Sequence, residues 1–155
     1  MDGVLNGVLA LLLAVMLMVI AAQVCCRFIL NNPLDWSEEL GRYLFVWLSF
    51  LGAAVGVKKG IHLGVDVILK RFPESFKKVI DLLMALLIQV FLCMVCYYGM
   101  QTLSVVRFQS SPSMGISMLY PYLAVPVGCV FMFINSIRVT CDRIRGAASG
   151  KEYPL

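Results

Sequence analysis

The chain has 155 residues, of which 61% are hydrophobic and 14% charged, and its formal net charge is +4. This composition excludes a disordered chain and a soluble globular domain. The basic residues lie between apolar stretches rather than on one face, which argues against a nucleic-acid partner.

Four apolar stretches dominate the chain. Gly3–Cys26, Leu82–Val106 and Phe108–Ile137 carry no formal charge, and the shorter stretch Tyr43–Val57 extends back to Ser37. A helix needs about 20 apolar residues to cross a bilayer. The stretches do not alternate as barrel strands do. We therefore expect an all-α polytopic membrane protein.

In chain order, four transmembrane helices are expected over about 4–26, 36–57, 77–106 and 118–140, within one membrane domain of residues 1–155. A short amphipathic helix over about 61–72 is expected in the membrane interface, because its apolar residues share one face. Pro126 should kink the last helix. The tail 146–155 is expected to be disordered.

The basic residues predict the orientation. Ten of the 13 Lys and Arg residues lie between the second and third helices or after the fourth, and three lie on the opposite side. Loops rich in Lys and Arg remain cytoplasmic. Both termini are therefore expected in the cytoplasm. The first helix has no Lys or Arg before it and is too long for a signal-peptide core, so we expect it to remain a membrane span.

Charged residues gather at the non-cytoplasmic end of the second helix. Arg42 follows Glu38 by four residues and Glu39 by three, so it can pair with either carboxylate. Arg27, at the end of the first helix, could join them. Two interpretations remain open: the charges anchor a helix end at the lipid headgroups, or they form a docking or solute-facing patch.

Small residues and one histidine mark two further candidate sites. Gly52 and Gly56 form a G-x-x-x-G step, which lets another helix approach closely. His62 is the only histidine, so we expect it to interact with Asp66 one turn later rather than to bind a metal.

The sequence lacks the motifs of several kinds of catalysis and transport. There is no phosphate-binding loop, and no Ser/His/Asp set can be placed. No carboxylate lies in the middle of a span, where ion-coupled carriers usually have one. We therefore expect no catalytic residue and no cofactor, and the pattern favours an accessory or scaffold role in a larger assembly.

Three segments carry a family resemblance. They resemble segments of the small membrane subunit of tripartite ATP-independent periplasmic (TRAP) transporters. The segments are Trp36–Ala54, then Lys58–Asp66 with its Gly, His and Asp, and then Ser113–Ile116 followed by Tyr120–Tyr122 and Val125–Gly128. Arg27 and Phe28 match the end of its first helix. The resemblance covers nearly the whole chain, in the family's order and spacing.

The resemblance implies a multi-pass protein of the bacterial inner membrane. Its partners would be a large membrane subunit of about a dozen helices, a periplasmic substrate-binding protein and membrane lipid. Uptake would be driven by a sodium gradient, and the solutes would be organic acid anions such as sialic acid, other sugar acids or C4-dicarboxylates. The small subunit would widen the static scaffold and help to dock the binding protein.

The resemblance also implies roles for the candidate residues. Arg27, Glu38, Glu39 and Arg42 become candidates for a periplasmic-side network or docking site. His62 and Asp66 become candidates for anchoring the interfacial helix, and Gly52 and Gly56 for packing against a partner helix.

Two alternatives stay open. A small four-helix multidrug exporter would need a glutamate in its first helix, and Gly3–Cys26 has none. A membrane disulfide-generating oxidoreductase would need cysteine pairs near the non-cytoplasmic surface. Cys25 and Cys26 are adjacent, which disfavours a disulfide, and Cys93 and Cys96 lie inside an apolar stretch, where packing is their expected role.

Overall fold

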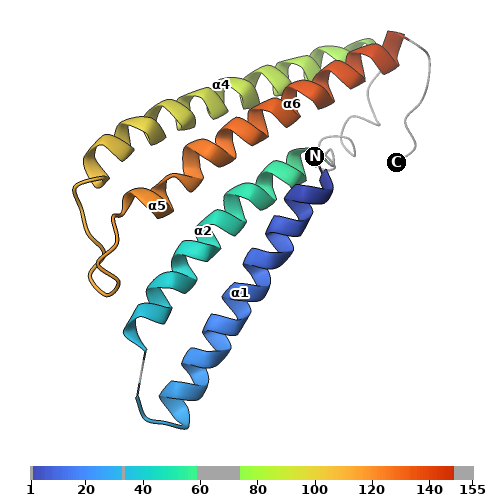
Figure 1. Ribbon diagram of the computed structural model, residues 1–155. Coiled ribbons are helices and arrows are strands. Elements are labelled where there is room, and N and C mark those ends of the chain that lie inside the picture. Colours follow the sequence, from blue (N-terminus) through green and yellow to red (C-terminus); the bar gives the residue numbers. More distant parts are fainter. Residues whose placement is uncertain (1, 33, 59–73, 149–155) are drawn as a thin grey trace.

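Four long helices and one short helix make up the described part of the chain (Figure 1). The structure is a computed structural model that describes residues 2–32, 34–58 and 74–148. The helices are α1 (Asp2–Phe28), α2 (Asp35–Lys58), α4 (Glu74–Val106), α5 (Leu119–Tyr122) and α6 (Ala124–Ala148). The residues that the structure describes contain no β-strand, only an isolated bridge between Ser110 and Ser117.

The predicted number of apolar helices is confirmed. Four candidate membrane spans meet the length and hydropathy that a crossing requires: Gly3–Phe28, Asp35–Val57, Leu82–Val106 and Leu119–Cys141. Except at the end of the last helix, the predicted starts and ends lie close to the observed ones, because long uncharged runs end where charged residues begin. The interfacial helix expected over 61–72 lies outside the described residues.

The helices lie side by side in the order α1, α2, α6, α4 (Figure 1). Successive long helices run in opposite directions, so the start of α1 and the end of α6 lie toward the same end of the bundle. The opposite end holds the α1–α2 connection and the α4–α5 connection, residues 29–34 and 107–118. We call it the loop end.

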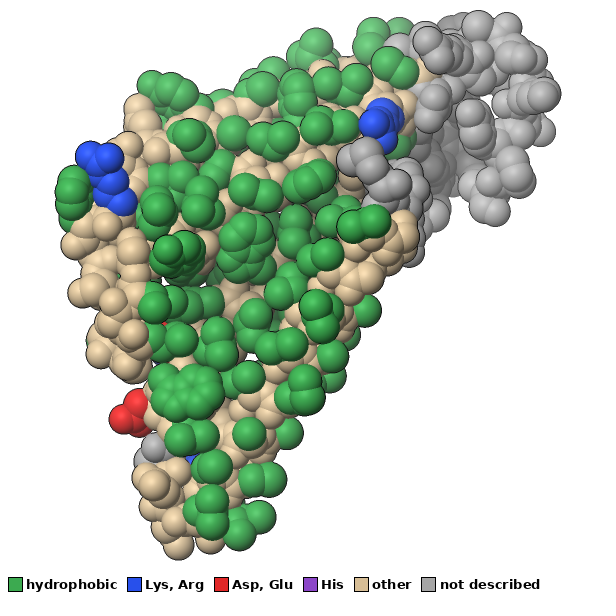
Figure 2. All heavy atoms as spheres, in the orientation of Figure 1, with side chains coloured by type: hydrophobic (Ala, Val, Ile, Leu, Met, Phe, Trp, Pro, Cys, Tyr) green, Lys and Arg blue, Asp and Glu red, His purple; other side chains and the backbone are tan. Residues whose placement is uncertain are grey.

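A small core forms where α2, α4 and α6 meet. Its buried members are Ala54, Leu92, Cys129 and Met132. Many other large apolar side chains are exposed, and they are spread over the face in Figure 2 between backbone and small side chains, with the charged groups near the ends. Inside a bilayer this surface meets hydrocarbon or other apolar helices, so it needs no burial within the chain.

The fourth span is interrupted at one residue, Leu123. A single helix over 118–140 with a kink at Pro126 was expected, but α5 ends at Tyr122 and α6 begins at Ala124. Pro126 has no N–H to donate to the Tyr122 carbonyl, and this weakens the helix one turn before the proline. Leu123 keeps helical dihedral angles, and its N–H and carbonyl still bond to Leu119 and Val127, so the chain continues in the same direction.

The end of α6 also differs from the prediction. The helix continues to Ala148, past the expected end at Thr140 and into the tail that was expected to be disordered from Gly146. Residues 149–155 lie outside the described part of the chain. Asp142, Arg143 and Arg145 therefore belong to the last turns of a helix that leaves the apolar span.

Candidate functional site at the loop end

Adjacent carboxylates at the start of α2 have different surroundings. Successive helical residues project about 100° apart, so Glu38 and Glu39 face different neighbours. Glu38 faces α1, where its Oε1 accepts a hydrogen bond of 2.8 Å from Gln23 Nε2. The same oxygen lies 3.6 Å from Arg27 Nη1. Both members of this ion pair are more than half exposed, so the pair joins α1 to α2 only weakly.

Glu39 faces the opposite way and is buried, with 4% of its surface exposed. Its Oε2 accepts hydrogen bonds from the backbone N–H groups of Ser113, at 3.1 Å, and Met114, at 3.2 Å. The Tyr43 hydroxyl donates to Oε1. A buried carboxylate is costly unless hydrogen bonds replace its water, and here the two N–H groups and the Tyr43 hydroxyl do so, with the Ser111 hydroxyl beside them.

The α4–α5 connection that Glu39 contacts is a small hairpin over residues 109–118. Ser111 N donates to Ile116 O at 2.8 Å, and Met118 N donates to Gln109 O at 2.9 Å. Gly115 has φ +67°, a left-handed conformation that favours glycine, and it closes the turn. The N–H groups of Ser113 and Met114 therefore point at Glu39 rather than at the hairpin's own carbonyls.

Two arginines at the loop end remain exposed. Arg42 was expected to pair with Glu38 or Glu39, but among the described residues it makes no ion pair. Arg107, at the end of α4, has its guanidinium carbon 4.5 Å from the centre of the Phe108 ring, a cation–π distance. Since Glu39 is buried and Glu38 faces Arg27, these arginines are exposed charges at the loop end that no carboxylate among the described residues pairs with.

One face of α2 is attached to the C-terminal half of the chain along most of its length. Farther along α2 from Glu39, away from the loop end, Trp47 Nε1 donates to Tyr120 O at 3.2 Å, and the Ala54 carbonyl accepts from Asn135 Nδ2 at 2.8 Å. Between these two bonds, a Cβ built on Gly128 would lie 2.6 Å from Phe50 Cβ. We call this set of contacts, from Glu39 to Ala54, the α2 seam.

The other predicted site residues have simpler positions. His62 and Asp66 lie outside the described residues. Gly52 is half-buried, and a Cβ built on it would meet no atom within 4 Å. Of Gly52 and Gly128, it is therefore Gly128 at which another described helix lies close. Sequence reasoning missed Gly128 because a single glycine in an apolar run carries no spacing signal.

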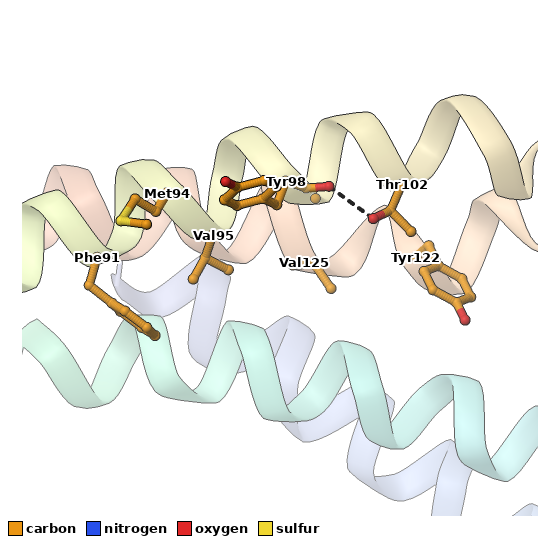
Figure 3. Close-up of a pocket in the computed structure, with 8 residues that line it drawn as sticks. Phe91, Met94, Val95, Tyr98, Thr102, Tyr122 and Val125 are labelled. Atoms are coloured by element: carbon orange, nitrogen blue, oxygen red, sulfur yellow. Dashed lines mark hydrogen bonds between the residues drawn. The ribbon is translucent and has the colours of Figure 1, made fainter.

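An apolar groove runs along α4 (Figure 3). Its volume is about 470 Å³, and the Thr102 hydroxyl in it donates to the Tyr98 carbonyl at 2.9 Å. It is lined by Phe91, Met94, Val95, Tyr98, Gly99, Thr102, Tyr122 and Val125. Since its lining is almost entirely apolar, the groove suits hydrocarbon better than a charged solute.

The cysteines show no pairing. All six are free, and only Cys129 is buried. Within the described ranges, no group of three His, Cys, Asp or Glu side chains is placed to hold a metal ion.

Comparison with known proteins places these features in a family. Residues 16–146 match the family of tripartite ATP-independent periplasmic transporters, DctQ component. The chain is 30% identical over 135 residues to the sialic acid TRAP transporter permease protein SiaT of Haemophilus influenzae, covering 87% of this chain and 21% of SiaT. The chain thus spans about a fifth of that relative.

Two shorter relatives match over most of the chain. The sialic acid TRAP transporter small permease protein SiaQ of Vibrio cholerae is 29% identical over 126 residues, 81% of this chain and 73% of SiaQ. The C4-dicarboxylate TRAP transporter small permease protein DctQ of Pseudomonas aeruginosa is 31% identical over 126 residues, 78% of this chain and 60% of that protein. This chain therefore belongs to the DctQ family, the small permease subunits of TRAP transporters.

Proposed function

We propose that this chain is the small permease subunit of a sodium-driven uptake system for organic acid anions in a bacterial inner membrane. The observation that carries the proposal is the family match over residues 16–146 on a fold with four candidate spans. Membership of a transporter family leaves no support for the oxidoreductase alternative. The small-exporter alternative needs a glutamate in the first helix, and α1 of this chain has none.

Relatives narrow the solute class. SiaT and SiaQ are named for sialic acid, and the Pseudomonas protein is named for C4-dicarboxylates. All of these solutes carry a carboxylate. We therefore expect a carboxylate-bearing solute, which a periplasmic binding protein captures and a large membrane subunit translocates.

In this proposal the chain is a scaffold for the large membrane subunit. The α2 seam supports a static role, because its hydrogen bonds and close packing join α2 firmly to α6. The apolar surface of α1 and α4 is available to the large subunit and to lipid. The Gly52 and Gly56 face is our candidate contact with a helix of that subunit, since none of the described residues lies within 4 Å of a Cβ built on Gly52.

The loop end faces the periplasm in this proposal, and both termini are cytoplasmic. The exposed Arg27–Glu38 pair and Arg42 are our candidates for contact with the binding protein, and His62 and Asp66 are our candidates for anchoring an interfacial helix. The basic residues near the opposite end support this orientation.

Reconstitution tests the function. The complex of this chain and its large subunit is placed in liposomes, and uptake of labelled sialic acid and of a C4-dicarboxylate is measured with the binding protein outside. We expect uptake of at least one solute that requires both an inward sodium gradient and this chain. Uptake of neither solute, or undiminished uptake by the large subunit alone, would contradict the proposal.

A further inference from the structure

We infer that Glu39 is a positioning residue: its buried carboxylate holds the 109–118 hairpin in one conformation, and the hairpin, not Glu39 itself, meets the periplasmic binding protein. The last part of the inference depends on the proposed function. The first part can be tested without it.

Burial separates Glu39 from the other charges at the loop end. With 4% of its surface exposed and the hairpin beside it, the Glu39 carboxylate is covered and cannot touch a docked protein in this conformation. Arg27, Glu38 and Arg42 are exposed at the same end. A direct docking role therefore suits these three residues and does not suit Glu39.

The hairpin has few other attachments to the rest of the chain. Its two arms bond mainly to each other, and the N–H groups of Ser113 and Met114 at its turn are bonded to Glu39. The Ser117 hydroxyl links its second arm back to the Arg107 carbonyl at 3.2 Å. Loss of the carboxylate would leave the hairpin tied to α2 through Tyr43, whose hydroxyl lies 3.3 Å from the Met118 sulfur and also interacts with Ser111.

The surface that the hairpin presents suits a protein partner. Pro112, Ser113 and Gly115 are exposed at the turn, and Phe108 and Arg107 are exposed at its base. This surface has an aromatic ring, a cation above it and polar backbone, and aromatic residues and arginine are enriched in protein interfaces. Because the negative charge of Glu39 is covered, the presented charge is positive, so an acidic patch on the partner is expected.

A buried serine provides the reporter. Ser111 is 3% exposed, and its hydroxyl accepts a hydrogen bond from Met114 N at 3.1 Å. In a background without the six native cysteines, Ser111→Cys is labelled with a hydrophilic maleimide in the complex, held in lipid nanodiscs. We expect Glu39→Ala to raise the labelling rate about tenfold, since each lost hydrogen bond shifts opening by several-fold. Glu39→Gln, which keeps an acceptor oxygen, should raise it less.

A nearby carboxylate provides the matched control. Asp35 is exposed in the first turn of α2, and no hydrogen bond among the described residues joins it to the hairpin. Asp35→Ala should leave the labelling rate unchanged. Equal labelling of the Ser111→Cys reporter with Glu39 present and with Glu39→Ala would overturn the inference.

Binding of the periplasmic protein to the same nanodiscs tests the second part. We expect Glu39→Ala to weaken binding about tenfold, with Glu39→Gln intermediate and Asp35→Ala unchanged. Faster labelling with undiminished binding would overturn the link from hairpin to partner. Failure of the unmodified complex to bind or transport would instead count against the proposed function, and the labelling result would still stand.

Discussion

The two sides of α2 differ in how firmly they are attached. On one side, the α2 seam combines the Glu39 hydrogen bonds, the Asn135 bond and the Phe50–Gly128 approach. On the other side, α1 packs on α2 with apolar side chains, joined at the loop end by Glu38, and it has no comparable contact with α4 or α6. Within one small subunit, a rigid pair of helices therefore carries a more loosely attached one.

This difference bears on the scaffold role. A static support needs a part that keeps its shape, and the α2 seam satisfies that need with groups buried in the chain. A membrane surface that adapts to a large partner needs an apolar face that no other helix of its own chain covers. Leu11, Leu17 and Met18 on α1 provide such a face, since all three are more than half exposed.

The largest expected effect comes from the seam. Gly128→Ala would place a methyl group 2.6 Å from Phe50 Cβ and 3.2 Å from its backbone carbon, so α2 and α6 must separate. Overpacking of this kind costs about 1–3 kcal/mol. Thermal unfolding of the purified complex should show a clear decrease in the midpoint.

The matched variant for this substitution lies on α1. A Cβ at Gly7 meets no atom within 4 Å, so Gly7→Ala should keep or slightly raise the unfolding midpoint. Equal midpoints for the two variants would show that the two sides of α2 do not differ as described.

A smaller effect is expected from the polar contact deeper in the seam. Asn135→Leu removes the hydrogen bond to the Ala54 carbonyl. Such bonds between transmembrane helices contribute about 0.6 kcal/mol on average and about 1.7 kcal/mol at most. Gln101→Leu is the comparison, because among the described residues the Gln101 amide bonds within its own helix α4, to the Tyr97 hydroxyl. If both variants lowered the unfolding midpoint equally, the hydrogen bond between α2 and α6 would stabilise the protein no more than a bond within one helix.

The smallest effect is expected where α1 meets α2. Arg27→Gln removes an exposed ion pair with Glu38 at 3.6 Å, which should contribute about 0–1 kcal/mol. The difference from the unmodified chain should vanish at about 1 M salt, where the screening length falls to about 3 Å. A decrease as large as that of Gly128→Ala, or one that persists in high salt, would contradict the weak attachment of α1.

Much of the fold could be predicted from hydropathy alone. Uncharged runs such as Leu82–Val106 are too long for anything but a span, and the observed α4 ends at the same residue, Val106. The break at Leu123 was harder to predict. Pro126 indicated that the helix would be disturbed. The break lies about one turn before the proline, because the carbonyl that loses its N–H donor is four residues before it.

The candidate site was predicted less completely. The sequence shows Glu38 and Glu39 as equivalent neighbours, and only the positions of α1 and the hairpin separate an exposed carboxylate from a buried one. The contact from Glu39 to Ser113 spans 74 positions along the chain, and no local pattern encodes it. Gly128 was missed for the same reason, because its role depends on the helix opposite.

Affinity purification from native membranes tests the central claim most directly. A tag on the C-terminus, extraction in mild detergent and mass spectrometry would identify what accompanies the chain. Membership in a TRAP transporter predicts a stoichiometric, very hydrophobic partner of about a dozen helices. A homo-oligomer of this chain, with no such partner, would contradict the proposed role.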